Sequence, residues 1–179
     1  MKIKQHIFLI GMMCSGKSSV APLLSKHFNI PYIDTDQDLI SILDANIEEI
    51  FNQLTEKKFR ELESTYFLEH IKKKQYIYAT GGGVILMKEN QKALQNNGIT
   101  VFLNTSLDII FNRLNKNKTK NRPLFKSINS LKDLEKLWEK RKKYYYNCSD
   151  IIIQTRGQSI NKLSTQIVNQ IQEYNNRKI

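Results

Sequence analysis

The sequence predicts an α/β protein in which a five-stranded parallel sheet lies between two layers of helices, a three-layer αβα arrangement. Short apolar, β-branched or aromatic runs recur along the chain, and segments with helical spacing separate most of them. Strands that alternate with helices form parallel sheets covered on both faces. We expect the strands at residues 7–10, 31–33, 76–79, 100–103 and 151–153.

Length and composition predict one compact domain over residues 1–179. The chain has 179 residues, of which 40% are hydrophobic and 25% charged, enough for a sizeable core. No segment approaches the roughly 20 apolar residues of a membrane span, so we expect no membrane partner. The apolar run after Lys2 and Lys4 leads into polar, glycine-rich sequence without a cleavage site, which favours a buried strand over a signal peptide. Cys14 and Cys148 form no zinc or disulfide pattern, so we expect a cytoplasmic protein.

The net charge of +11 indicates an acidic partner: nucleic acid, an anionic membrane surface or a small phosphorylated ligand. Composition does not choose among these. The alternative is that lysine-rich stretches, such as residues 72–74, are solvated helix faces.

The stretch GMMCSGKSS predicts a phosphate-binding loop. Gly11, Gly16, Lys17 and Ser18 match G-x-x-x-x-G-K-[ST], after an expected strand and before an amphipathic segment at 19–28. In such a loop, backbone N–H groups and a helix N-terminus surround phosphates, the lysine reaches the β- and γ-phosphates, and the hydroxyl holds Mg²⁺. We therefore expect ATP or GTP to contact Gly11, Cys14, Ser15, Gly16, Lys17, Ser18 and Ser19.

Two carboxylates follow the second expected strand, in YIDTD. Asp34 and Asp36 lie where that strand leaves the sheet, at the edge where α/β proteins bind ligands. Asp34 is our candidate for the magnesium side, with Ser18, and Asp36 for the substrate. The alternative is that Asp36 or Asp38 only caps the next helix.

Gly81, Gly82 and Gly83 follow the third expected strand. Three consecutive glycines let the backbone lie directly against a ligand, so we expect this loop in the acceptor pocket. A plain turn is the alternative.

Arg141 is expected to face inward. Leu134, Leu137, Trp138 and Tyr145 follow helical spacing, and Arg141 falls on the same stripe. An inward guanidinium needs an anion, which could be a carboxylate-bearing or phosphorylated substrate or an internal Asp or Glu. Spacing alone allows Arg60 merely to pair with Glu56 or Glu63 on a helix surface.

Taken in order, these motifs resemble those of shikimate kinases, which are P-loop kinases of the nucleoside-monophosphate kinase type. The resemblance runs from GMMCSGKSS through YIDTD, KKFRELE, TGGG, NRPL and EKRKKYY to QTRGQS. It implies transfer of the γ-phosphoryl group of Mg·ATP to the 3-hydroxyl of shikimate, a step towards chorismate and the aromatic amino acids. It also implies a substrate-binding helical segment at about 36–72, a mobile lid at about 114–127 and a monomer.

The resemblance assigns roles position by position. Lys17, Asp36 and Arg122 match the catalytic group, in which Asp36 binds the shikimate hydroxyls with a proposed role as base and Arg122 closes on the phosphates. Arg60 and Arg141 match the arginines that hold the shikimate carboxylate, and Gly82 matches a backbone contact to the substrate. Arg113 matches a residue near adenine. The last loop lacks the proline often found there in this family, and we expect Gln158 to contact the base.

Two other functions are consistent with parts of the pattern. One is a small-molecule kinase of the same architecture, for example a gluconate or nucleotide kinase, which would lack paired inward arginines for a carboxylate. The other is a nucleic-acid-binding protein, suggested by the basic and aromatic residues at 140–146. Helical spacing sends several of those aromatic rings inward, so we expect no nucleic-acid partner.

Overall fold

A parallel β-sheet forms the centre of the computed structural model, which describes residues 5–43, 55–116 and 128–177. The described strands are β1 (His6–Ile10), β2 (Tyr32–Asp34), β3 (Ile77–Ala79), β4 (Gly98–Thr105) and β5 (Ile151–Thr155). They pair in the order β2-β3-β1-β4-β5, and all the pairings among the described strands are parallel. The expected five-stranded parallel sheet is confirmed, with β4 longer than its apolar run at 100–103 indicated.

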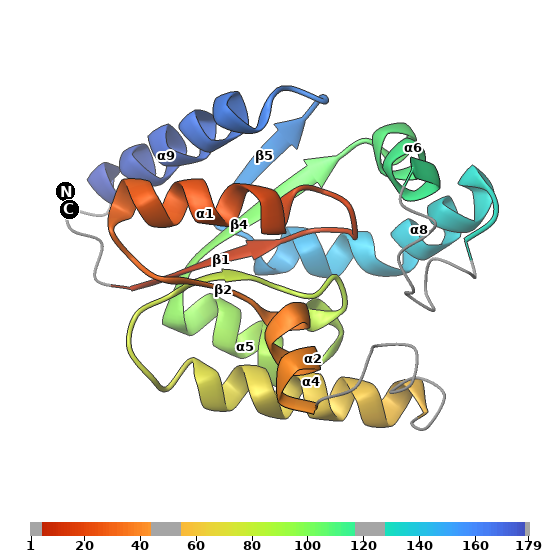
Figure 1. Ribbon diagram of the computed structural model, residues 1–179, viewed down its shortest axis with the longest axis horizontal. Helices are drawn as coiled ribbons and strands as arrows, with labels where there is room; N and C mark the ends of the chain where they lie inside the picture. Colours follow the sequence, from red (N-terminus) through yellow and green to blue (C-terminus); the bar gives the residue numbers. More distant parts are fainter. Residues whose placement is uncertain (1–4, 44–54, 117–127, 178–179) are drawn as a thin grey trace.

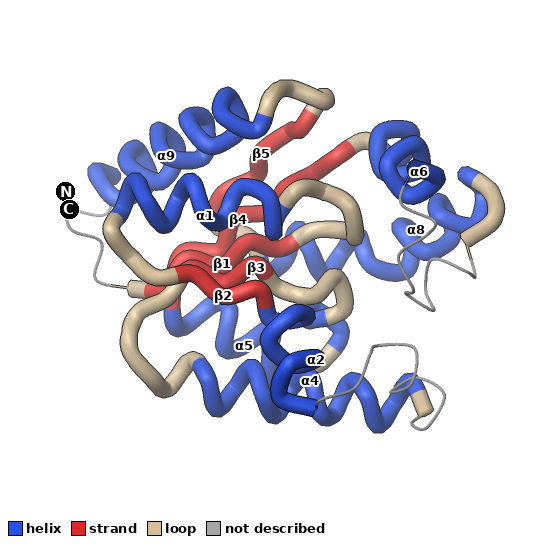
Figure 2. Tube along the Cα trace, in the orientation of Figure 1, coloured by secondary structure: helices blue, strands red, loops and turns tan. Residues whose placement is uncertain are grey.

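Helices cover both faces of this sheet, as Figures 1 and 2 show, which confirms the three-layer arrangement. One face carries α1 (Lys17–Phe28) and α9 (Ile160–Arg177). The other carries α4 (Glu56–His70), α5 (Lys88–Asn97) and α8 (Leu131–Cys148), together with the short 3₁₀ helix η1 (Val84–Leu86). α6 (Leu107–Lys116) packs near α8, and α2 (Thr35–Leu43) follows β2 directly.

Burial on both faces explains the continuous apolar run Ile7–Ile10 in β1. Ile7 and Leu9 pack into the core under α1 and α9, whereas Phe8 and Ile10 pack into the core on the opposite face. All four side chains are fully buried. A strand covered on both faces needs a continuous apolar run rather than alternation, so the segment is a central strand, as expected.

The parallel order brings the carboxyl ends of the strands to one edge of the sheet. β1 lies between β3 and β4, so the loops after β1, β2 and β3 meet at this edge. These loops carry the glycine-rich motif, the two aspartates and the three glycines. Ligands bind α/β sheets at such an edge, beside the point where strand order changes direction.

The helical segment expected at 36–72 is helical where it is described, in α2 and α4. Residues 44–54 lie outside the described residues. Of the expected lid at 114–127, residues 114–116 end α6, and the remainder, with Arg122, also lies outside them. Among the helices that the structure describes, none combines the length and the hydropathy needed to cross a membrane.

Candidate active site

The loop between β1 and α1 has the backbone that a phosphate cradle requires. Gly11 and Gly16 have φ angles of 145° and 107°, and Cys14 has a φ of 58° although it carries a side chain. A Cβ on Gly11 would lie 2.8 Å from the carbonyl oxygen of Leu103, so only glycine fits between this loop and β4. The loop then enters α1 at Lys17, which leaves the N-terminus of that helix facing the cradle.

Lys17 folds back over the loop that carries it. Its buried Nζ donates to the carbonyl oxygens of Gly11, at 2.9 Å, and Met12, at 2.8 Å, and to Ser15 Oγ at 3.3 Å. From α6, Arg113 Nη1 donates to the carbonyl oxygen of Cys14 at 2.8 Å. Two cations therefore lie against one loop, which makes it strongly attractive to a polyanion.

A cavity of about 430 Å³ lies next to this loop and joins it to the ends of β2 and β3. Its polar lining includes Lys17, Asp34, Asp36 and Arg113. The structure thus brings nucleotide-binding and acceptor-binding candidates into one space. The complete lining is Met13, Cys14, Gly16, Lys17, Ser18, Ser19, Asp34, Asp36, Gln37, Thr80, Gly82, Arg113 and Ile160.

Asp34, not Asp36, makes the helix-capping contacts at the end of β2. Its Oδ1 accepts hydrogen bonds from the backbone N–H groups of Asp36 and Gln37, both at 3.2 Å. These are first-turn donors of α2 that have no partner inside the helix. Asp34 therefore fills the capping role that the sequence left open for Asp36 or Asp38, and the carboxylate of Asp36 lines the cavity.

Two of the three glycines after β3, Gly81 and Gly83, lie directly under charged side chains. A Cβ on Gly81 would come within 2.6 Å of Asp36 Oδ1 and 2.3 Å of Glu63 Oε1. A Cβ on Gly83 would come within 2.2 Å of Arg60 Nη1. Since real Cβ contacts are not this short, a side chain at Gly81 or Gly83 would displace these charged groups, a demand that a plain turn would not impose.

Arg60 lies in the interior rather than on a helix surface. Its Nη1 donates to Glu63 Oε2 at 2.7 Å, and the two side chains are 9% and 6% exposed. The expected pairing with Glu63 is confirmed, but its placement on a surface is wrong, because α4 packs this face against the glycine loop. Burial raises the pKa of Glu63 above the ordinary glutamate value, and the positive charge of Arg60 opposes that rise.

Glu63 is a site residue that our sequence analysis considered only as a surface partner. Its second oxygen, Oε1, is buried and has no hydrogen-bond partner among the described residues. Glu63 Oε1 lies above Gly81, where Asp36 Oδ1 also lies. The sequence signal for this pair was the spacing of three residues between Arg60 and Glu63 on a helix. That spacing does not distinguish a buried pair from an exposed one.

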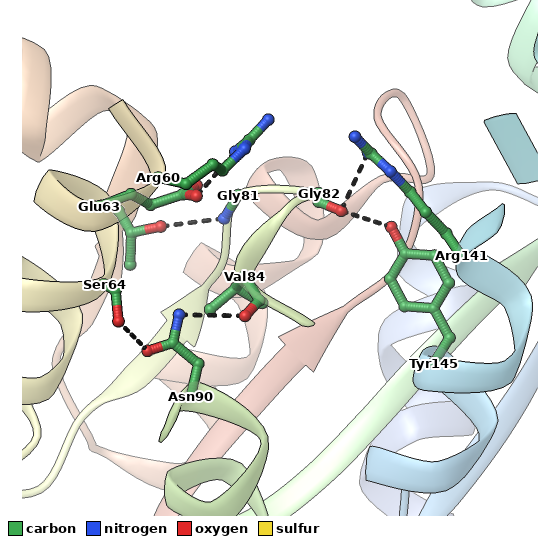
Figure 3. Close-up of polar contacts among 10 residues, drawn as sticks. Arg60, Glu63, Ser64, Gly81, Gly82, Val84, Asn90, Arg141 and Tyr145 are labelled. Carbon is green, nitrogen blue, oxygen red and sulfur yellow. Dashed lines mark hydrogen bonds and ion pairs between the residues drawn. The ribbon is translucent and has the colours of Figure 1, made fainter. Parts of the chain in front are cut away.

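Arg141 faces inward, as its position on the helical stripe predicted. It is 4% exposed, and its Nη1 donates to the carbonyl oxygen of Gly82 at 3.3 Å. Tyr145, one turn later on α8, donates to the same oxygen at 2.6 Å. Figure 3 shows Arg60 and Arg141 on opposite sides of the Gly81–Gly82 backbone, with both guanidinium groups extending beyond it on the same side.

One nucleotide-site prediction is not joined to this cluster. Gln158 is not among the residues that line the cavity. Its Oε1 accepts from the backbone N–H of Arg156 at 2.7 Å, and its Nε2 donates to Gln166. Ile160, at the start of α9, is the residue of this region that lines the cavity.

Part of the basic and aromatic segment at 140–146 is buried in the interior of the protein. Tyr145 is fully buried and stacks with Phe102, their ring centroids 5.1 Å apart at an interplanar angle of 9°. Tyr146 is 43% exposed. A base-stacking surface needs exposed rings, so this segment mainly builds the core and the site.

Metal-binding donors at the site are few. Across residues 5–43, 55–116 and 128–177, no cluster of three or more His, Cys, Asp or Glu could hold a metal ion. Ser18 and Asp34 do line the same cavity. One hydroxyl and one carboxylate fit Mg²⁺, which keeps several waters and binds substrate phosphates rather than an all-protein cage.

Comparisons with known proteins agree with this geometry. The family model described as shikimate kinase matches residues 13–172. A shikimate kinase of Thermodesulfovibrio yellowstonii is 33% identical over 174 residues, 97% of this chain and 99% of the relative. One from Persephonella marina is 35% identical over 167 residues, covering 93% and 96%.

A solved structure shows the same fold. The shikimate kinase of Acinetobacter baumannii in complex with shikimate superposes with a TM-score of 0.90 at 28% identity, over 96% of this chain and 95% of that one. With a family model over most of its length and relatives above 30% identity, this chain belongs to the shikimate kinase family.

Proposed function

We propose that this chain transfers the γ-phosphoryl group of Mg·ATP to the 3-hydroxyl of shikimate, in the route to chorismate and the aromatic amino acids. One observation carries the proposal: Arg60, Arg141 and Asp36 come together around the Gly81–Gly83 loop, next to a phosphate-binding loop. Two guanidinium groups suit a carboxylate, and a carboxylate suits hydroxyl groups. An acceptor that carries both kinds of group fits this arrangement.

On the acceptor side, Arg60 and Arg141 would hold the carboxylate of shikimate. Asp36 would orient its hydroxyls, with the Gly81, Gly82 and Gly83 backbone lying against the ring. Both arginine side chains are almost fully buried, so water screens their attraction to an anion less than it would on the surface. Asp36 acts mainly by positioning, because phosphoryl transfer through a loose transition state needs little early proton removal.

On the nucleotide side, the loop of residues 11–19 would hold the phosphates, with Lys17 on the β- and γ-phosphates. Ser18 and Asp34 would hold Mg²⁺, which would neutralise phosphate charge when bound. The capping contacts of Asp34 use Oδ1, and its carboxylate lines the cavity opposite the loop. Arg113 would lie near adenine, and Gln158 would reach the base only if its amide left its present partners.

Residues 114–127 would form a lid, with Arg122 closing on the phosphates. Phosphoryl transfer gains from exclusion of water, since water would otherwise compete as acceptor. We also infer that residues 1–179 form one domain that acts as a monomer, because every candidate group of the site comes from one chain. Both cysteines are free thiols, in keeping with a reducing cytoplasm.

The test is ADP release from Mg·ATP by the purified chain, measured alone and with shikimate, gluconate or a nucleoside monophosphate. We expect strong stimulation by shikimate and none by the other acceptors, with shikimate 3-phosphate identified by mass spectrometry. Omission of Mg²⁺ should abolish the reaction. Stimulation by another acceptor, or by none, would contradict the proposed substrate.

A further inference from the structure

Two side chains of α8 donate to a single backbone oxygen in the acceptor pocket. The carbonyl oxygen of Gly82 accepts from Tyr145 Oη at 2.6 Å and from Arg141 Nη1 at 3.3 Å (Figure 3). Tyr145 makes the shorter bond, so it fixes the oxygen more firmly than Arg141 does. Arg141 uses one of its five N–H donors here, and a guanidinium anchored this way is oriented before substrate arrives.

We propose that Tyr145 is a positioning residue for the acceptor: its hydroxyl sets the peptide between Gly82 and Gly83 and, through the shared oxygen, the orientation of Arg141. This inference rests on the proposed function and adds a residue to it. Tyr145 itself touches neither nucleotide nor acceptor in the proposal. It acts through the backbone that does.

The backbone needs such a constraint. Gly82 is flanked by two further glycines, so residues 81–83 carry no Cβ atoms that would restrict their conformation, and glycine explores more of φ/ψ space than any other residue. The N–H of Gly81 is held by Thr35 Oγ1 at 3.0 Å, and the carbonyl of Gly82 is held by Tyr145 and Arg141. The described peptides are all trans. Because a trans peptide is planar, a Gly82 carbonyl held towards α8 fixes the N–H of Gly83 in the opposite direction, away from α8.

Tyr145 is itself held rigidly. Its fully buried ring stacks on Phe102 and on Trp138, whose ring centroid is 6.1 Å away at an interplanar angle of 18°. Its hydroxyl also lies 3.7 Å from Met12 Sδ, in the phosphate-binding loop. The hydroxyl therefore sits at the junction of α8, the glycine loop and the phosphate-binding loop.

The hydroxyl stays a donor under working conditions. Burial raises the pKa of Tyr145 to about 12, and the positive charge of Arg141 opposes that rise. Its hydrogen bond to Gly82 is thus present at any pH at which a kinase would be assayed.

Tyr145→Phe is the direct test, because it removes one hydroxyl and keeps the ring that fills the stack. Tyr78→Phe is the matched control. Tyr78 is also fully buried, and its hydroxyl donates to a backbone oxygen, that of His70, at 3.2 Å, in an aromatic cluster outside the site. Tyr78 Oη also lies 3.3 Å from His70 Nδ1, so Tyr78→Phe should lower the melting temperature at least as much as Tyr145→Phe does.

We expect Tyr145→Phe to raise the KM for shikimate about five- to tenfold, the effect of losing about 1 kcal/mol of preorganisation. The KM for ATP should stay within about twofold, and Tyr78→Phe should leave both constants unchanged. An unchanged shikimate KM in Tyr145→Phe, or equal changes in both variants, would overturn the proposal. Absence of shikimate turnover in the unaltered chain would instead overturn the proposed function, and the inference with it.

Discussion

Glu63 holds the guanidinium of Arg60 in place, with 2.7 Å between Oε2 and Nη1 and both side chains buried. The pair lies three residues apart on α4, and Gly83 passes directly beneath its arginine. A buried guanidinium without a carboxylate partner would destabilise the folded protein, so Glu63 balances the charge of Arg60 and orients it inside the protein.

Glu63→Gln should therefore weaken acceptor binding while the chain stays folded. The amide oxygen still accepts from Arg60, but a neutral hydrogen bond is about half as strong as a charged one. We expect the KM for shikimate to rise about fivefold, and the KM for ATP to be unchanged, in steady-state assays. Glu61→Gln is the control, because Glu61 lies on the exposed face of the same helix and pairs with Lys57, at 4.0 Å. Equal effects of both substitutions would contradict a role for the buried pair.

Gly83→Ala should act through Arg60. The new methyl group would lie 2.2 Å from Nη1 and 2.4 Å from Cζ, so the guanidinium must move, whereas the backbone need not. We expect at least a tenfold rise in shikimate KM with a small change in melting temperature. The double variant Gly83→Ala/Arg60→Ala should be no worse than Arg60→Ala alone, and additive effects in this cycle would show that the methyl group acts elsewhere.

Lys17→Met should abolish turnover and preserve the fold. The methionine keeps most of the aliphatic stem but removes the ammonium that the proposed mechanism places on the β- and γ-phosphates. We expect kcat to fall by about a hundredfold or more. Circular dichroism should show unchanged helix content. Lys26→Met, an exposed position on the same helix α1, should retain full activity, and near-normal phosphoryl transfer by Lys17→Met would remove Lys17 from the site.

Arg141→Lys tests whether Arg141 binds the acceptor carboxylate through its positive charge alone or also through the geometry of its guanidinium group. Lysine keeps a positive charge but cannot form the two parallel hydrogen bonds of a guanidinium. We expect the KM for shikimate to rise about tenfold or more, with a larger rise in Arg141→Ala and little change in the KM for ATP. Lys140→Ala, on the exposed face next to it, is the control. If the shikimate KM were the same in all three variants, Arg141 would not bind the acceptor.

His70 should make stability depend on pH. Burial lowers its pKa below the ordinary value of 6.5, and the positive charge of Lys73 lowers it further. The folded state then binds fewer protons than the unfolded state, so its contribution is complete above about pH 6.5 and is lost as pH falls towards the folded pKa. The free energy of unfolding from urea titrations should fall between pH 7.5 and pH 5. This fall should be smaller in His70→Gln, and an identical slope would exclude His70 as its source.

The sequence by itself determined those features of the protein that depend on residues close together in the chain. The phosphate-binding loop is one nine-residue stretch between an apolar run and a helix, and its glycines Gly11 and Gly16 stand at positions with positive φ angles. The inward direction of Arg141 also followed from the sequence, because helical periodicity fixes the face on which a side chain lies. The parallel sheet followed from the alternation of strands and helices.

Only the tertiary structure decided which of these parts meet. Strand order placed the loops after β1, β2 and β3 side by side, and this made Gly81 a neighbour of Asp36 and Glu63. The same folding turned the Arg60–Glu63 pair from a surface contact into a buried one. The bond from Tyr145 to Gly82 joins residues 63 positions apart. Local periodicity tells which face a residue occupies, but not what another segment packs against that face, and such long-range packing completes the site.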